Sequence, residues 1–288
     1  MIYILISICC SVFVSILLKL ARRYQIDVYQ AITWNYSIAI ILVLLFLKPD
    51  LRNLQATPVS IYSLLGVLLP TLFVVIASSI RYTGIVRTEI ALRLSLLISV
   101  IAAFALFGEA ITPLKIIGLL LGFVAINFCV IRKNPNKGEK APVNTWIFLL
   151  VVFVGMGIID ILFKQMALVK GVSFGTSLFI TYVIAFVLAL LGLIYLIITR
   201  KTKFSWPHIF VGWILGISNF GNIFFYIKAH QALAKNPSVV FTGMNIGVIV
   251  LGSIVGLFIF KEKLSLLNKA GIVLAIIAII VISIAGKY

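Results

Sequence analysis

The stretch Phe107–Leu114, which reads Phe-Gly-Glu-Ala-Ile-Thr-Pro-Leu, returns late in the chain as Phe-Lys-Glu-Lys-Leu-Ser-Leu-Leu at residues 260–267. The register continues downstream, where Gly118 matches Gly271. Chance similarity between apolar segments would not keep Phe, Glu, a hydroxyl residue and Gly in step. We therefore interpret the chain as a duplication, and a repeat of this kind sets the architecture.

The composition is that of a membrane protein. Apolar residues make up 63% of the 288 residues and charged residues 11%, with a mean hydropathy of +1.24, whereas soluble domains carry about 25% charged residues. Apolar runs of about 20 residues tile the chain, each long enough to cross a bilayer as a helix. They are continuous and rich in Ile, Leu and Val, which favours helices over a barrel of alternating strands. The predicted helices cover residues 2–20, 29–47, 58–80, 85–107, 113–131, 146–167, 174–199, 207–229, 236–260 and 266–286.

A polar connection at residues 132–145 divides these ten helices five and five. We expect a first five-helix repeat over residues 1–131 and a second over residues 146–288. Since five is odd, the second repeat must enter the membrane from the opposite side. The predicted fold class is an all-α membrane protein of ten transmembrane helices in two inverted five-helix repeats. Close helix packing is predicted at pairs of small residues spaced four apart: Gly118/Gly122, Gly212/Gly216 and Gly252/Gly256.

The charged and reactive residues exclude several other classes of protein. The net charge of +17 does not indicate nucleic-acid binding, because Lys and Arg are scattered among short loops without a nucleic-acid motif. We interpret the basic excess as contact with anionic lipid. Cys9, Cys10 and Cys129 lie in apolar runs without metal-ligand spacing, so neither a disulfide framework nor a zinc site is indicated. We expect no enzyme activity and no cofactor, since no catalytic or nucleotide-binding motif occurs.

Two motifs and the helix count carry a resemblance to a known family. Arg81–Gly84 (Arg-Tyr-Thr-Gly) follows the third helix, and Phe-x-Glu-x-Ile/Leu-Thr/Ser follows the fourth and the ninth. The chain thereby resembles the EamA-like ten-helix bacterial transporters of the drug/metabolite transporter superfamily. The resemblance implies a basket of helices one to four and six to nine around a central cavity, with helices five and ten at the periphery. It also implies alternating access in a multi-pass protein of the inner membrane.

Ionisable residues inside the predicted helices are the first candidates for a substrate site. A charge at mid-membrane costs about 2.5 to 3.5 kcal/mol, so it is expected to face a cavity or a partner. Glu89 and Arg93 share one face of the fourth helix with the acid first, the better order for an ion pair. A structural pair near the helix end is the equal alternative. Asp160 lies deeper and is expected to face the cavity, whereas Lys164 and His230 are expected to reach the interface and solvent.

Uncharged polar residues form a second candidate set. Those on the eighth and the ninth helix are spaced three apart, so each pair shares a helix face. We predict that these residues line the substrate site, and the alternative is that they hydrogen-bond helices to one another. The set is Asn35 in the second helix, Asn219 and Asn222 in the eighth, and Thr242 and Asn245 in the ninth.

The two acids of the repeated motif, Glu109 and Glu262, are assigned to turns. Each is followed three residues later by a hydroxyl residue, Thr112 or Ser265, at the start of the next helix. We predict that these hydroxyls cap the helix N-termini by accepting backbone N–H groups. On this interpretation the motif marks the family without belonging to the substrate site.

The predicted function is secondary transport, with export the expected direction, of a small polar metabolite such as an amino acid or a related compound. Arg93 would hold a carboxylate, and Glu89 or Asp160 an amine or a proton. A transporter of a lipid-linked or phosphorylated substrate is the first alternative, and an intramembrane non-transport protein is the second. The expected partners are the solute, protons and the lipid bilayer, in a monomer or homodimer. Loop charges favour termini outside the cell, whereas the resemblance implies termini inside.

Overall fold

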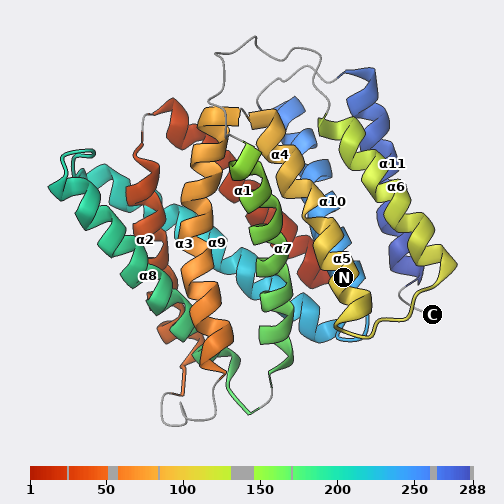
Figure 1. The fold of residues 1–288 in the computed structure, drawn as a ribbon, viewed down its shortest axis with the longest axis horizontal. Coiled ribbons are helices and arrows are strands. Elements are labelled where there is room, and N and C mark those ends of the chain that lie inside the picture. Colours follow the sequence, from red (N-terminus) through yellow and green to blue (C-terminus); the bar gives the residue numbers. More distant parts are fainter. Residues whose placement is uncertain are drawn as a thin grey trace.

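The computed structural model describes residues 1–24, 26–50, 58–83, 85–130, 146–169, 171–259 and 265–285, and all regular structure in these ranges is helical (Figure 1). The helices run through the chain without an intervening strand in the described ranges. They are α1 (Ile2–Arg23), α2 (Val28–Leu42) continued by the π-helix η1 (Val43–Leu47), α3 (Val59–Thr83), α4 (Ile85–Leu94), α5 (Leu96–Ala105), α6 (Pro113–Val130), α7 (Trp146–Leu168), α8 (Phe174–Ile198), α9 (Trp206–Ala232), α10 (Pro237–Phe258) and α11 (Leu266–Ala285).

The membrane character predicted from the sequence is confirmed. Within the described residues, seven helical segments are long and apolar enough to cross a bilayer: α2 with η1, α3, α7, α8, α9, α10 and α11. Three shorter apolar helical segments, Ile2–Leu18, Ile90–Ala105 and Pro113–Phe128, fall in the remaining predicted runs. The helix bounds agree with the predicted runs to within a few residues, because each polar connection ends an apolar segment where the backbone can leave the membrane.

The fourth predicted helix, residues 85–107, is corrected in two places. It is interrupted at Ser95, where the side-chain hydroxyl donates a hydrogen bond of 2.6 Å to the carbonyl of Leu92. Such a bond competes with the helical ladder and bends helices. The helix also ends at Ala105. Gly108 then takes a φ of 63°, and the N–H of Glu109 bonds back to the carbonyl of Ala103 at 3.1 Å. This glycine-terminated turn fixes the direction in which Glu109 leaves α5.

The helices pack in a pattern that places two of them, α6 and α11, at the edge of the bundle. α1 lies against α9 and α10, and α7 lies against α3, α4 and α5. α2 packs against α8 and α9, and α3 also packs against α8. α6 and α11 lie side by side at one edge of the bundle (Figure 1). Buried side chains from most of the helices therefore meet in one core, to which α6 and α11 contribute from the edge of the bundle.

The glycine pairs predicted to lie in helix seams behave differently from one another. A Cβ on Gly212 or Gly216 would lie 2.7 or 2.2 Å from side-chain atoms of α2, and a Cβ on Gly118 or Gly122 would overlap α11 or α10. These four residues permit close helix approach as predicted. Gly252 is corrected: no atom of the described residues lies within 4 Å of its ideal Cβ, so its face of α10 meets no neighbouring helix there.

Candidate functional site

Asp160 on α7 is a buried acid that three other helices reach. The residue as a whole is 9% exposed. It accepts a hydrogen bond of 2.9 Å from the Ser99 hydroxyl on α5 and another of 2.9 Å from the Tyr226 hydroxyl on α9. Arg93, in the last turn of α4, lies close enough for its positive charge to act on the carboxylate. The fold thus brings two of the predicted site residues, Asp160 and Arg93, into one neighbourhood.

The other member of the predicted ion pair, Glu89, cannot be compared with this arrangement. The Glu89 side chain lies outside the part of the molecule that the structure describes, although its backbone belongs to α4. The pairing of Glu89 with Arg93 therefore stays a prediction. Arg93 is partly buried, which is the placement expected of a cation that faces other helices rather than lipid.

The predicted polar residues of α2 and α9 connect helices. Asn219 donates from its amide nitrogen to the side-chain oxygen of Asn35 at 3.3 Å, with both residues buried. Asn222 accepts from the Ser7 hydroxyl on α1 at 2.8 Å through its side-chain oxygen and at 2.9 Å through its backbone carbonyl. Although Asn219 and Asn222 share a helix, they meet different neighbours. Their contacts are those of interhelical hydrogen bonds, and their role toward a solute stays a prediction.

The two predicted residues of α10 lie in different surroundings. Asn245 is partly buried and donates to the carbonyl of Phe241 in its own helix at 3.1 Å. Thr242 is fully buried, and its hydroxyl has no hydrogen-bond partner among the described residues. It lies beside α6, since a Cβ on Gly122 would be 3.8 Å from the Thr242 methyl group. No contact of the described atoms links either residue to Asp160, so their place in the site is also untested.

Two fully buried tyrosines face each other across α2 and α8. The ring centroids of Tyr36 and Tyr182 are 6.4 Å apart. Within the described residues, neither hydroxyl has a hydrogen-bond partner. A third buried tyrosine, Tyr62 on α3, accepts a hydrogen bond of 2.9 Å from the Ser177 hydroxyl. Nothing near either residue in the sequence indicates that Tyr36 and Tyr182 would meet.

We expect the Tyr36→Phe variant to be as stable as the wild-type protein or more stable by up to about 1 kcal/mol. The reason is that the removed hydroxyl leaves a buried site in which it makes no protein hydrogen bond. The measurement is thermal unfolding in detergent. Tyr62→Phe is the matched control, and it should lower stability by about 1 kcal/mol because Ser177 loses the closer of its two acceptors and keeps only the Ser173 carbonyl at 3.4 Å. An equal loss of stability in the two variants would contradict this expectation.

The predicted placements of Lys164 and His230 are wrong, because neither side chain reaches the interface or solvent. Each is fully buried. The Lys164 ammonium donates to the backbone carbonyl of Ala234 at 2.8 Å and to that of His230 at 3.4 Å. The His230 ring packs between Tyr226 and Phe241, with centroid distances of 4.7 and 4.8 Å. Snorkelling was expected from the position of Lys164 along its helix, but the end of α9 covers that position.

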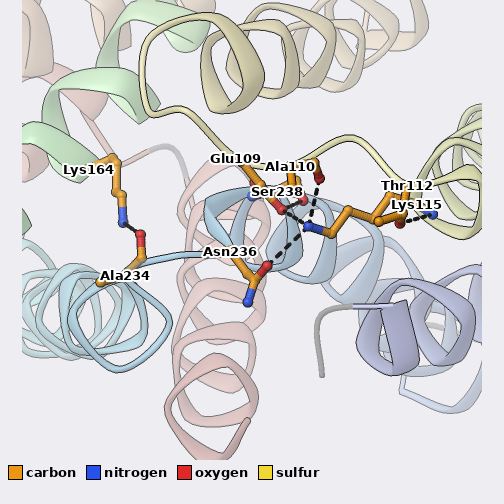
Figure 2. A network of polar contacts seen from close by, with 8 residues as sticks. All are labelled: Glu109, Ala110, Thr112, Lys115, Lys164, Ala234, Asn236 and Ser238. Atoms are coloured by element: carbon orange, nitrogen blue, oxygen red, sulfur yellow. Dashed lines mark hydrogen bonds and ion pairs between the residues drawn. The ribbon is translucent and has the colours of Figure 1, made fainter. Parts of the chain in front are cut away.

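The motif acid Glu109 is also buried, and its side chain binds a distant part of the chain (Figure 2). One carboxylate oxygen accepts from the backbone N–H of Ser238 at 2.8 Å, and the other accepts from the Ser238 hydroxyl at 2.5 Å. The Lys115 ammonium lies 2.9 Å from the same carboxylate and donates to the Asn236 side chain at 3.1 Å. The assignment of Glu109 to a turn is correct for its backbone, but its side chain joins α5 and α6 to the start of α10.

The predicted helix caps that accompany the motif acids are confirmed. Thr112 accepts from the backbone N–H of Lys115 at 3.3 Å at the start of α6. Ser265 accepts from the backbone N–H of Asn268 at 3.2 Å at the start of α11. Glu262 lies outside the described residues. The two copies of the motif therefore share their capping chemistry, while the contacts of Glu109 are known only for the first copy.

Comparison with known proteins gives three findings. A sequence model described as the EamA-like transporter family matches residues 1–131. A protein of Haemophilus influenzae, described as uncharacterised, is 43% identical over 284 residues, which cover 96% of this chain and 95% of that protein. A protein of known crystal structure superposes with a TM-score of 0.71 at 14% identity and covers 98% of both chains, which shows a shared fold.

Proposed function

Because the chain belongs to the EamA-like transporter family, we propose that this membrane transporter carries a small polar metabolite, such as an amino acid or a related compound. It acts in the bacterial inner membrane by alternating access, with export as its direction and protons as the coupling ion. The solute is bound near the interface of two helix repeats, where inverted-repeat transporters place their sites. Family membership supports the transport activity, and the contacts of Asp160 support the place of the site.

The proposal includes two inverted five-helix repeats, residues 1–131 and residues 146–288, joined by residues 132–145. The helix contacts support this arrangement. α1 lies against α9 and α10, while α7 lies against α3 and the two short helices α4 and α5. In the proposed repeats, α1 corresponds to α7, α3 to α9, and α4 with α5 to α10. Exchanging each helix for its counterpart converts the first set of contacts into the second, as a two-fold axis in the membrane plane would. α2 with α8, and α6 with α11, are then pairs of counterparts in direct contact.

The observation that carries the site is the burial of Asp160 among groups from both repeats. Ser99 and Arg93 come from the first repeat, and Tyr226 comes from the second. An acid within a membrane helix is destabilising by a few kcal/mol unless a partner or water offsets the loss of hydration. An acid held in this way can bind the amine of a solute or exchange a proton, and the neighbouring guanidinium suits a carboxylate. The arrangement therefore fits a zwitterionic or amine-bearing metabolite.

We expect proteoliposomes containing the purified protein to exchange at least one radiolabelled amino acid or related small polar compound, with uptake that saturates. Empty liposomes are the control. A panel of the common amino acids and their simple amine and carboxylate derivatives can first be ranked by thermal stabilisation of the protein in detergent, since a specific ligand raises stability by mass action. If the protein moves only lipid-linked or phosphorylated compounds, the polar-metabolite proposal is wrong and the first alternative replaces it.

A further inference from the structure

The short turn between α9 and α10 is bound on both sides by charged side chains from other elements (Figure 2). α9 ends at Ala232 and α10 begins at Pro237. On one side of the turn, Lys164 from α7 binds the carbonyl of His230 at the end of α9 and that of Ala234 in the turn itself. On the other side, Glu109 and Lys115 from the α5–α6 region bind the first residues of α10. The turn is therefore fixed by contacts to parts of the chain that are distant in sequence.

The signs of these charges match the helix ends that they bind. The carbonyls at the C-terminus of a helix attract a cation, and the N–H groups at its N-terminus attract an anion. Lys164 meets the carbonyl of His230 in the last turn of α9 and that of Ala234 just beyond it. Glu109 meets the N–H of Ser238 in the first turn of α10. Asn236 makes no side-chain cap of its own for α10, so the carboxylate of Glu109 supplies the missing acceptor. These contacts stabilise the closed turn electrostatically.

We propose that Glu109, Lys115, Asn236 and Ser238 form a gate, here called the Glu109 clamp, that shuts one end of the bundle and opens during transport. Glu109 and Lys115 belong to the first proposed repeat, and Asn236 and Ser238 belong to the second. The inference rests on the proposed function, because alternating access requires the two repeats to separate at one end at a time. The segment from Glu109 to Lys115 cannot separate from the start of α10 while the clamp is intact.

Burial identifies the described state of the clamp as closed. Glu109 is 5% exposed, Lys115 is 3% exposed and Ser238 is fully buried, so water is excluded from the ion pair. A buried ion pair gains attraction but loses hydration, and the two terms are of similar size. When the end opens, water can hydrate both charges, which compensates for the contacts that break. A clamp of this chemistry can therefore hold one state firmly without making the open state inaccessible.

The clamp can be tested by the access of a water-soluble reagent to a buried position near the end of α9, the helix that leads into the clamped turn. Ala229 on α9 is 1% exposed and precedes His230, whose carbonyl binds Lys164. In a background with the three native cysteines replaced by serine, Ala229→Cys supplies a single thiol at this position. The rate at which a membrane-impermeant maleimide labels this thiol in proteoliposomes reports how often the end of the bundle opens. The measurement needs no knowledge of the solute.

Glu109→Gln should raise this labelling rate about tenfold, because it removes the ion pair and weakens charge-assisted hydrogen bonds that together account for at least one factor of ten in an equilibrium. Ser238→Ala removes only the hydroxyl bond, is less disruptive to folding, and should give a smaller increase in the same direction. Asn268→Ala is the matched control, since it removes side-chain hydrogen bonds outside the clamp, to the backbone N–H of Ser265 and to the carbonyl of Phe128. It should leave the labelling rate unchanged.

The gate proposal is overturned if the labelling rate is the same with the native clamp as in the Glu109→Gln and Ser238→Ala variants, whether or not a solute is found. A lower melting temperature with an unchanged labelling rate would likewise show that Glu109 is only a helix cap. If labelling rises as expected and the vesicles transport no compound of the panel, the transport proposal fails while the clamp stands. If labelling rises in Asn268→Ala as much as in Glu109→Gln, general loosening explains the result and the gate is overturned.

Discussion

Asp160→Asn should lower solute transport in proteoliposomes by about tenfold to hundredfold. A hydrogen bond to a charged group contributes roughly 1.5 to 3 kcal/mol, and each 1.4 kcal/mol corresponds to about a factor of ten. The variant keeps the shape of the side chain but removes its negative charge and its titration. Its amide oxygen can still accept from Ser99 or Tyr226, whose hydroxyls now reach Asp160 from two helices. The fold should therefore survive, and the loss should appear in transport rather than in thermal stability.

The matched control for this substitution is Asp27→Asn. Asp27 caps the N-terminus of α2 by accepting from the N–H groups of Tyr29 and Gln30, at 2.8 and 3.3 Å. Asparagine is as good a helix cap as aspartate, and the position lies outside the buried site. We expect Asp27→Asn to transport at the wild-type rate. If Asp160→Asn does so as well, Asp160 is a structural acid and the proposed site is wrong.

Gly216→Ala should destabilise the protein by about 1 to 3 kcal/mol, the usual range for overpacking a tight contact. An ideal Cβ at this position would lie 2.2 Å from the Ile38 side chain, 2.5 Å from the carbonyl oxygen of Asn35 and 3.0 Å from the Asn35 Cα. Two of these atoms belong to the backbone of α2, so a change of rotamer cannot relieve the overlap. The helices α2 and α9 would have to separate, which would also stretch the hydrogen bond between Asn35 and Asn219.

Gly192→Ala on α8 separates this effect from the general effect of replacing glycine in a helix. No atom of the described residues lies within 4 Å of the ideal Cβ of Gly192. Alanine is favoured over glycine in a helix by roughly 0.5 to 1 kcal/mol, so this variant should be equally or more stable. Unfolding in detergent with increasing denaturant measures both. A stability loss at Gly216 no greater than that at Gly192 would contradict the close approach of α2 and α9.

The helices could be predicted from the sequence because their information is local. Hydropathy and length placed the apolar segments, and the hydroxyls of Thr112 and Ser265 predicted two helix starts that the structure confirms. The interruption at Ser95 could not be predicted in this way, since apolar residues continue on both sides of it. The bend depends on a single side-chain hydroxyl that donates to a backbone carbonyl, and hydropathy does not indicate which partner a hydroxyl binds.

The site was predicted less completely because it depends on contacts between distant segments. Asp160 was recognised by its charge within an apolar helix, but nothing near it in the sequence indicated that Tyr226 and Ser99 would be its partners. Lys164 was misplaced for the same reason, since its position along the helix says nothing about what covers it. Charge within a membrane helix therefore identifies candidate site residues. Deciding between a solute site and a structural contact requires the three-dimensional structure.

The contact of Glu109 with Ser238 also bears on biosynthesis. The two residues are 129 positions apart in the chain. A ribosome adds about 5 to 20 residues each second, so Glu109 is made several seconds or more before Ser238. During that interval the carboxylate must be hydrated at the membrane surface or held by Lys115, which follows it closely in sequence. The first half of the protein is therefore synthesised before the partner residue of Glu109 exists. The contact between Glu109 and Ser238 forms only after α10 has been made.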